Sequence, residues 1–246
     1  MASIHDLMHH SGFVFEGTVE QLGASTSKAY APVAETVVVR VTRLVKSTPA
    51  LAGYQGQRVT VHLQAPVRLA AGQHATFFTH GIHYGNGLVL TEVGTMGPGA
   101  PPAEAEMTAA LQASNDTAMA ERLAQADLVV SGVASAPHRR TATQVATTAG
   151  VPTSRVSEHD PDWWVATIAI DSVVKGTHDA NTKDVLFANS TDIAWARSPK
   201  VRQGDRGVWL LHTTDAYGRP VPAHAVTHPL DFRPVSEVAR VRRLMR

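Results

Sequence analysis

The feature that most constrains this chain is an internal repeat, in which five segments of the N-terminal half recur in the same order in the C-terminal half. In each half an apolar run ends in glycine, an alternating strand closes on two aliphatic residues and a lysine, and a third apolar strand follows. A turn glycine then leads through an aromatic strand to a histidine, and a Tyr-Gly pair comes shortly after. The matched segments are 13–17 with 128–132, 37–46 with 166–175, 58–63 with 183–187, 72–80 with 204–212, and 84–87 with 217–220. Five matches in one order predict a duplicated structural unit.

Each copy has the pattern of an all-β unit. The runs that end in Gly17 and Gly132 are typical of buried strands that bend at a glycine. Helical periodicity is confined to the edges of the copies. The expected helices are 4–10, 103–112, 116–126 and 236–245. The two middle helices would close the first unit and open the second, so we place the boundary at Asn115 and expect domains 1–114 and 115–246.

Composition removes several classes of chemistry. The chain has no cysteine, which excludes disulfides, thiolate nucleophiles, iron–sulfur ligation and zinc sites that use cysteine. Its 22 basic and 21 acidic residues give a net charge of +1, so no overall field attracts phosphate backbones or anionic lipid. The first residues lack the pattern of a signal peptide, and no apolar run is long enough to cross a bilayer. We therefore expect no membrane insertion and a cytoplasmic location.

The second copy carries a likeness to a known family. Its aliphatic pair followed by Lys-Gly, at 173–176, and its Gly-acidic-x-x-x-aromatic-aliphatic strand, at 204–210, resemble the netrin/TIMP-like branch of OB-fold domains. This resemblance implies a mainly β fold of two tandem OB-like β-barrels with short flanking helices. The inhibitor members of that family use disulfides to present an N-terminal cysteine to a metalloprotease zinc. Because this chain has no cysteine, that activity is not carried over.

Histidines raise the question of a metal site, because the chain has 13 of them and imidazole is a common ligand for transition metals. The best candidates are His80 and His83, with His62 from a neighbouring strand. In the second copy the position matched to His80 is His212, but no histidine matches His83. This difference favours a structural role for the His80 and His212 pair, such as a hydrogen bond at a strand end. We assign no metal and expect no cofactor.

Catalytic signatures are also missing from the sequence. It has no nucleophile elbow, no His-Glu-x-x-His and no phosphate-binding or dinucleotide-binding glycine fingerprint. Asp160 and Asp162 could form a general acid and base pair, but they flank a proline in a polar loop where carboxylates are normally hydrated. We therefore predict that the protein is not an enzyme.

Single-stranded nucleic acid is the usual ligand to consider for an OB-like barrel, and binding it requires a basic groove with aromatic stacking platforms. The outward strand positions are mostly Thr, Ala, Ser and Gln, with Arg40, Arg43 and Arg58 as scattered exceptions. The strand aromatics Phe77 and Trp209 have the pattern of core residues. Nucleic-acid binding therefore remains an alternative and is not favoured.

The two copies differ most in the segment 136–162, which is longer in the second copy and ends at Trp163 and Trp164. Alternation predicts that one of these indoles points into the barrel and the other points out. An outward tryptophan beside a long loop could anchor a protein partner or could cover the end of the barrel, and Trp195 has the same two interpretations. The candidate partner-binding residues are Trp163, Trp164, Trp195, His138, Arg139 and Arg140.

These patterns favour a non-catalytic protein-binding or assembly module that joins a protein partner or its own copies. The alternative is a single-stranded nucleic-acid-binding OB-fold protein. A histidine-ligated metal-binding protein or a hydrolase ranks third.

Overall fold

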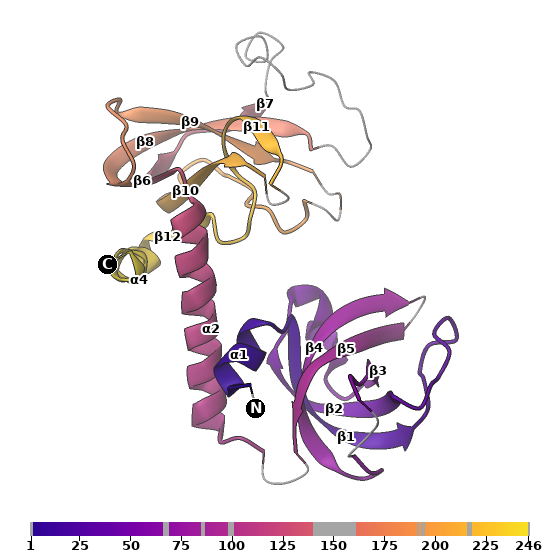
Figure 1. Cartoon of the computed structure of the whole chain (residues 1–246). Helices are drawn as coiled ribbons and strands as arrows, with labels where there is room; N and C mark the ends of the chain where they lie inside the picture. Colours follow the sequence, from indigo (N-terminus) through magenta and orange to yellow (C-terminus); the bar gives the residue numbers. More distant parts are fainter. Residues whose placement is uncertain are drawn as a thin grey trace. The chain divides into compact units, whose positions relative to one another are not determined.

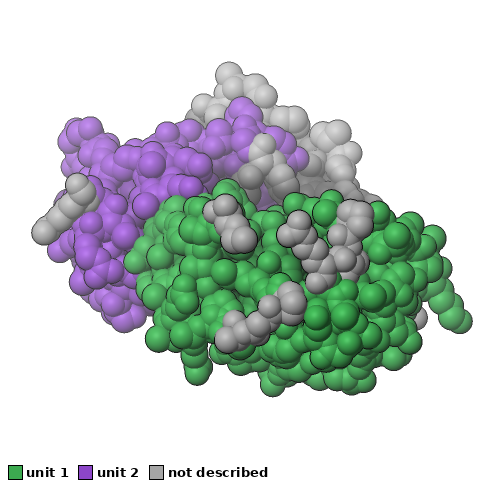
Figure 2. All heavy atoms as spheres, turned by 60° about the horizontal axis from the view of Figure 1, so that its bottom comes forward, with its two compact units in different colours: residues 1–117 green, residues 118–246 purple. Residues whose placement is uncertain are grey.

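The computed structural model divides the chain into two compact units, 1–117 and 118–246, and each is described by itself (Figure 2). The structure describes residues 2–65, 69–84, 87–97, 101–139, 161–190, 192, 195–215 and 218–245. No helix within these residues is both long enough and apolar enough to cross a membrane.

The first unit is a closed five-stranded barrel. Its strands are β1 (Phe13–Leu22), β2 (Thr36–Lys46), β3 (Arg58–His62), β4 (His74–Tyr84) and β5 (Gly87–Met96), with α1 (Ile4–His9) before them and η1 (Pro49–Tyr54) between β2 and β3. The strands follow the order β1-β2-β3-β5-β4, and β4 closes the barrel on β1. The pair β3 and β5 is parallel, whereas the other pairs are antiparallel. This is the five-stranded Greek-key arrangement of an OB-like barrel.

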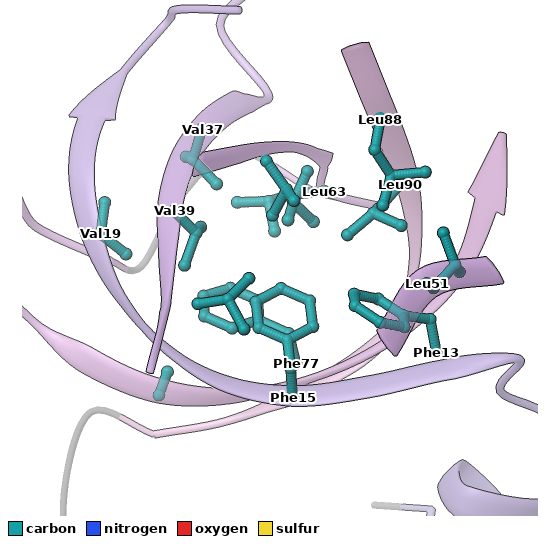
Figure 3. Close-up of a cluster of buried hydrophobic side chains, with 14 residues drawn as sticks. Phe13, Phe15, Val19, Val37, Val39, Leu51, Leu63, Phe77, Leu88 and Leu90 are labelled. Carbon is teal, nitrogen blue, oxygen red and sulfur yellow. The ribbon is translucent and has the colours of Figure 1, made fainter. Parts of the chain in front are cut away.

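Aromatic and branched side chains fill this barrel, and Figure 3 shows them converging from all sides on its interior. Phe13, Phe15 and Phe77 are fully buried, and the rings of Phe15 and Phe77 stack with centroids 5.2 Å apart. Val37 and Val39 enter from β2, so the period-two alternation of the strand supplies one wall of the core.

The second unit repeats the barrel. Its helices and strands are β6 (Leu128–Ala134), β7 (His138–Arg139), β8 (Trp163–Lys175), β9 (Thr182–Ala188), β10 (Arg206–Thr214), β11 (Pro220–Val226), β12 (Phe232–Pro234), η2 (Val235–Glu237) and α4 (Val238–Leu244). The pairings run β6-β8-β9-β11-β10 and return to β6, and β9 and β11 are the parallel pair. Two closed five-stranded barrels confirm the predicted mainly β fold of tandem OB-like barrels.

The first strand of each barrel bends at a glycine, as the sequence predicts. A shift of register falls between Glu16 and Gly17 in β1 and between Ser131 and Gly132 in β6. A Cβ on Gly132 would lie 2.2 Å from a backbone oxygen of β8, and one on Gly17 would lie 2.5 Å from a valine methyl group of β2. The bulge therefore brings the strands so close that a side chain does not fit.

The prediction of two separate helices between the barrels is wrong, because residues Glu104–Gln125 form the single helix α2. This stretch contains neither glycine nor proline, so nothing in it ends a helix. The first part packs Met107 and Ala110 against Met8 of α1 and the outside of the first barrel, and Figure 1 shows α1 beside this part of α2. The last part packs Met119 and Leu123 on the second barrel. One helix thus closes the first unit and opens the second.

The two lysines that end the long matched strands perform the same task in each unit. The Nζ of Lys46 donates a hydrogen bond to the carbonyl oxygen of Met8 at 2.7 Å, near the end of α1. The Nζ of Lys175 donates to the carbonyl oxygens of Leu123 and Ala124, both at 2.8 Å, near the end of α2. The last carbonyls of a helix lack partners within it, so each lysine joins a helix end to its barrel. The repeat therefore extends to how the helices are attached.

Candidate functional site

The tryptophan pair begins the longest strand of the second barrel, β8, between β7 and β9. Trp164 pairs with Arg139 of β7 and with Phe187 of β9. Its indole packs on the interior core, whereas Trp163 packs on a separate apolar cluster outside the barrel. The prediction that one indole points inward and the other outward is confirmed.

The outer cluster consists of side chains from three strands. Its buried members are Val165, Leu186, Val221 and Ala225. Trp163 packs on them, and its ring meets that of Trp195 edge to face with centroids 5.7 Å apart. Trp195 is only 1% exposed. The interpretation of Trp195 as an exposed anchor is therefore wrong for this structure, because its indole is a packing element and the partly buried Trp163 is the more accessible of the two.

A lysine holds the segment that carries Trp195 in place. The Nζ of Lys200 donates hydrogen bonds to the carbonyl oxygens of Ala188 at 2.5 Å, Ser190 at 3.0 Å and Trp195 at 3.0 Å. Burial lowers the pKa of the Lys200 ammonium. Three carbonyl acceptors compensate for the water that this cation loses, so Lys200 ties the backbone at Ala188, Ser190 and Trp195 together.

Two arginine–carboxylate pairs contact the tryptophans, one at Trp164 and one at Trp195. The Nε of Arg139 donates to Asp162 Oδ1 at 3.1 Å, and the indole N–H of Trp164 donates to Asp162 Oδ2 at 3.2 Å. Arg219 pairs with Asp215 at 2.7 Å and lies 5.9 Å above the ring of Trp195. The side chains of Arg139 and Arg219 are 73% and 56% exposed.

Two contact groups therefore meet at the start of β8: Arg139 and Asp162 with Trp164, and Arg219 and Trp195 with Trp163. They are joined through the backbone of the two neighbouring tryptophans, and we call the six residues together the tryptophan–arginine cluster. The fold brings together four of the six predicted partner-binding residues in this cluster. His138 is exposed on β7 and pairs with Val165, the outward neighbour of Trp163 in β8. Arg140, and most of the predicted loop 136–162, lie outside the described residues. Asp215, Arg219 and Lys200 were not predicted, because their partners are distant in sequence or sit in irregular segments without a pattern.

The histidines do not assemble a metal site among the residues that the structure describes. His62 and His80 both pair with Thr91, so strand β5 separates them. The Nδ1 of His62 lies 2.5 Å from the hydroxyl of Tyr30, a hydrogen-bond partner within the protein. The side chain of His83 is outside the described set. His212 is 1% exposed whereas His80 is exposed, so the matched pair does not share one environment.

On the outer face of the first barrel, the face that an OB fold commonly offers to nucleic acid, part of the β1–β2 connection lies against β3. The amide of Thr26, in the β1–β2 connection, donates to the hydroxyl of Thr60 on β3 at 2.8 Å. The arginines Arg40 and Arg58 both face Glu20, at 2.6 and 3.7 Å. This face therefore combines a covering loop with neutralised cations, which is unlike the open basic groove that single strands require.

The corresponding outer face of the second barrel carries two carboxylates on its strands. Thr167 of β8 donates to the carboxylate of Asp184 on β9 at 2.6 Å. Asp171, further along β8, pairs with Arg206 of β10 at 2.6 Å. Asp171 thus balances the charge of Arg206, and the Asp184 carboxylate, whose partner is neutral, repels a phosphate group.

Comparison with known proteins adds no identity: no family model matches the chain, and no curated protein matches it.

Proposed function

We propose that this chain is a non-catalytic protein-binding module whose docking surface is the tryptophan–arginine cluster of the second unit. The observation that carries the proposal is the connected arrangement of Trp163 on Trp195 with the guanidinium of Arg219 over the same indole. Tryptophan and arginine dominate the energetically important positions of protein interfaces. Here the buried Trp195 and the Lys200 contacts hold the accessible edge of Trp163 in one place, so little entropy is lost when a partner packs on it.

The charges of this surface favour a protein over a polyanion. Arg139 and Arg219 each already face a carboxylate, Asp162 and Asp215 respectively. A phosphate backbone would approach both the arginine and its acid, so the net attraction is small. A protein surface can complement both charges of a pair, as the polar rim of an interface does.

The scaffold itself suggests an origin. The Lys-Gly turn at 173–176 and the strand at 204–210 support a proposal that both barrels descend from a netrin/TIMP-like OB domain. The cysteine-free sequence is the reason to assign the present function to the tryptophan–arginine cluster and not to that family's inhibitory N-terminus. The cytoplasm remains the proposed compartment.

The test compares two exposed arginines of the second unit that both pair with an aspartate. Arg219→Glu reverses a charge that is 56% exposed, paired with Asp215 and placed over Trp195. Arg206→Glu reverses one that is 57% exposed and paired with Asp171 outside the cluster. The full chain is purified from its native cells after in-cell cross-linking, and partners are quantified by mass spectrometry. We expect one defined partner, or the chain itself, with wild type and Arg206→Glu, and at least a tenfold loss with Arg219→Glu.

A second arm separates the alternatives. Fluorescence anisotropy with a labelled mixed-sequence oligonucleotide should show no binding that weakens with salt. Equal partner recovery from both arginine variants would refute the docking surface. Salt-dependent oligonucleotide binding without any protein partner would refute the proposed function itself.

A further inference from the structure

A buried ion pair joins helix α2 to the second barrel. Asp231 is 0% exposed and accepts hydrogen bonds from Nε and Nη2 of Arg122 at 2.6 and 2.9 Å. The backbone amides of Thr227 and His228 also donate to its Oδ2, both at 2.8 Å. Residues 227–231 form the turn between β11 and β12, so this turn presents a carboxylate to the last part of α2.

Two histidines contact this pair. The Nε2 of buried His212 lies 3.2 Å from Asp231 Oδ1, but it has no hydrogen-bond partner of good geometry within the described structure. The Nδ1 of His228 accepts the amide N–H of Leu230 at 3.2 Å. An imidazole nitrogen accepts a hydrogen bond only while it carries no proton. The closed turn therefore requires His228 to be neutral.

In the first unit, helix α1 is attached to its barrel by apolar groups at the matched place, so the two units can be compared. Leu210 of β10 bonds to the carbonyl of Asp231, and its counterpart Phe78 of β4 pairs with Gly94 of β5. Gly94 is covered by Leu7 of α1, since a Cβ there would lie 2.6 Å from a methyl group of Leu7. The second unit thus has an arginine and an aspartate where the first has a leucine and a glycine.

The surroundings of His228 oppose its protonation. Burial lowers the pKa of His228, and the positive charges of Arg122 and Arg197 lower it further, against an opposing effect of Asp231. Burial also lowers the pKa of His224 on β11. The charged and titratable groups that act on these two histidines are Arg122 of α2, Asp127 before β6, His178 and Lys183 around the start of β9, Arg197 of the segment before β10, His212 of β10, and Asp231.

We propose that the 227–231 turn is an acid-sensitive latch, closed at neutral pH and opened when His228 takes up a proton. The new N–H at Nδ1 removes the acceptor of the Leu230 amide and places a cation beside Arg122 and Arg197. Opening the turn withdraws Asp231 from Arg122, which loosens the last part of α2 on its own barrel. The Leu7–Gly94 contact of the first unit contains no titratable group.

The direction of the pH dependence follows from linkage. A histidine with a lowered pKa in the closed state binds its proton more readily when the turn is open. The closed turn is therefore fully favoured above the ordinary histidine pKa of about 6.5, and it loses stability as the pH falls through that value. One linked proton allows at most about a tenfold change in the opening equilibrium for each pH unit.

Amide hydrogen exchange of the full chain between pH 7.5 and 5 tests this inference. The reporters are the amides of Thr227, His228 and Leu230, which donate the hydrogen bonds of the closed turn. A matched control is the amide of Arg202, which donates to the carboxylate of Asp205 at 2.7 Å in another turn of the same unit. After correction for intrinsic rates, we expect protection of the reporters to fall several-fold for each pH unit below about 6.5 while that of Arg202 is unchanged.

Two variants and one titration complete the test. His228→Asn keeps an acceptor for the Leu230 amide but cannot be protonated, so the reporter amides of this variant should stay protected from exchange at pH 5. The control His138→Asn changes an exposed histidine and should behave as wild type. The ring of His228, followed by NMR in the wild-type chain, should titrate together with the loss of protection. The latch is overturned if wild-type protection does not change, if Arg202 loses protection in parallel, if His228→Asn keeps the acid response, or if ring titration and exchange do not coincide.

Discussion

Breaking the Arg122–Asp231 pair should be among the most damaging single changes in the second unit. Asp231→Asn removes the negative charge but leaves an oxygen that can still accept the Thr227 and His228 amides. The guanidinium of Arg122, whose side chain is 11% exposed, then stays in the protein without a counter-charge. Removing one partner of a buried pair typically costs about 3–5 kcal/mol, and we expect a loss in this range. Arg122→Leu should cost a similar amount, because it leaves the carboxylate unpaired.

The double variant Arg122→Leu with Asp231→Asn tests the electrostatic reasoning. It removes both charges and places at position 122 the leucine that the first unit has at position 7. Replacing a buried ion pair by neutral groups is often close to neutral in stability, since the desolvation penalty of both ions disappears. We therefore expect the double variant to lose less free energy of unfolding than either single variant, a coupling of several kcal/mol in a double-mutant cycle.

Tryptophan fluorescence during urea unfolding is a suitable assay, because all four tryptophans belong to the second unit. Trp209 is fully buried in its core and should report the loss of the barrel. Linear extrapolation then gives the free energy of unfolding for each variant. Single losses below about 1 kcal/mol, or a double variant that loses the sum of both, would show that the pair is not a coupled buried interaction.

Two further changes probe the scaffold and the candidate site. Gly132→Ala should lower the free energy of unfolding of the second unit by at least about 2 kcal/mol, because its Cβ would lie 2.2 Å from a backbone oxygen of β8. The control Gly53→Ala has open space around the new Cβ, so its free energy of unfolding should be unchanged or rise by about 0.4–1 kcal/mol. Thermal unfolding followed by circular dichroism measures both variants. Lys200→Met should remove the three carbonyl contacts, expose Trp195 and so increase the quenching of tryptophan fluorescence by acrylamide. Lys28→Met, in the first unit, is the control and should leave the quenching unchanged. An unaltered quenching constant in Lys200→Met would contradict the role given to this lysine.

The repeat and the barrels were predictable because short-range sequence patterns encode them. Period-two alternation assigns strand faces, and the glycines at 17 and 132 mark the bends, so each segment carries its own evidence. The inward and outward assignment of Trp164 and Trp163 followed from the same rule. The two-helix interpretation failed where a polar Asn115 was read as a boundary, although no glycine or proline was present to stop α2.

The sequence by itself therefore determined the duplication, the all-β architecture and the exclusion of cysteine chemistry, because these depend on composition and short-range periodicity. Only the tertiary structure decided that Trp195 is buried, that Lys200 gathers three carbonyls and that Arg122 meets Asp231, 109 residues away. Such contacts depend on which distant segments the closed barrel places together. The charge on a side chain is visible in the sequence, but its burial and its partner are properties of the fold.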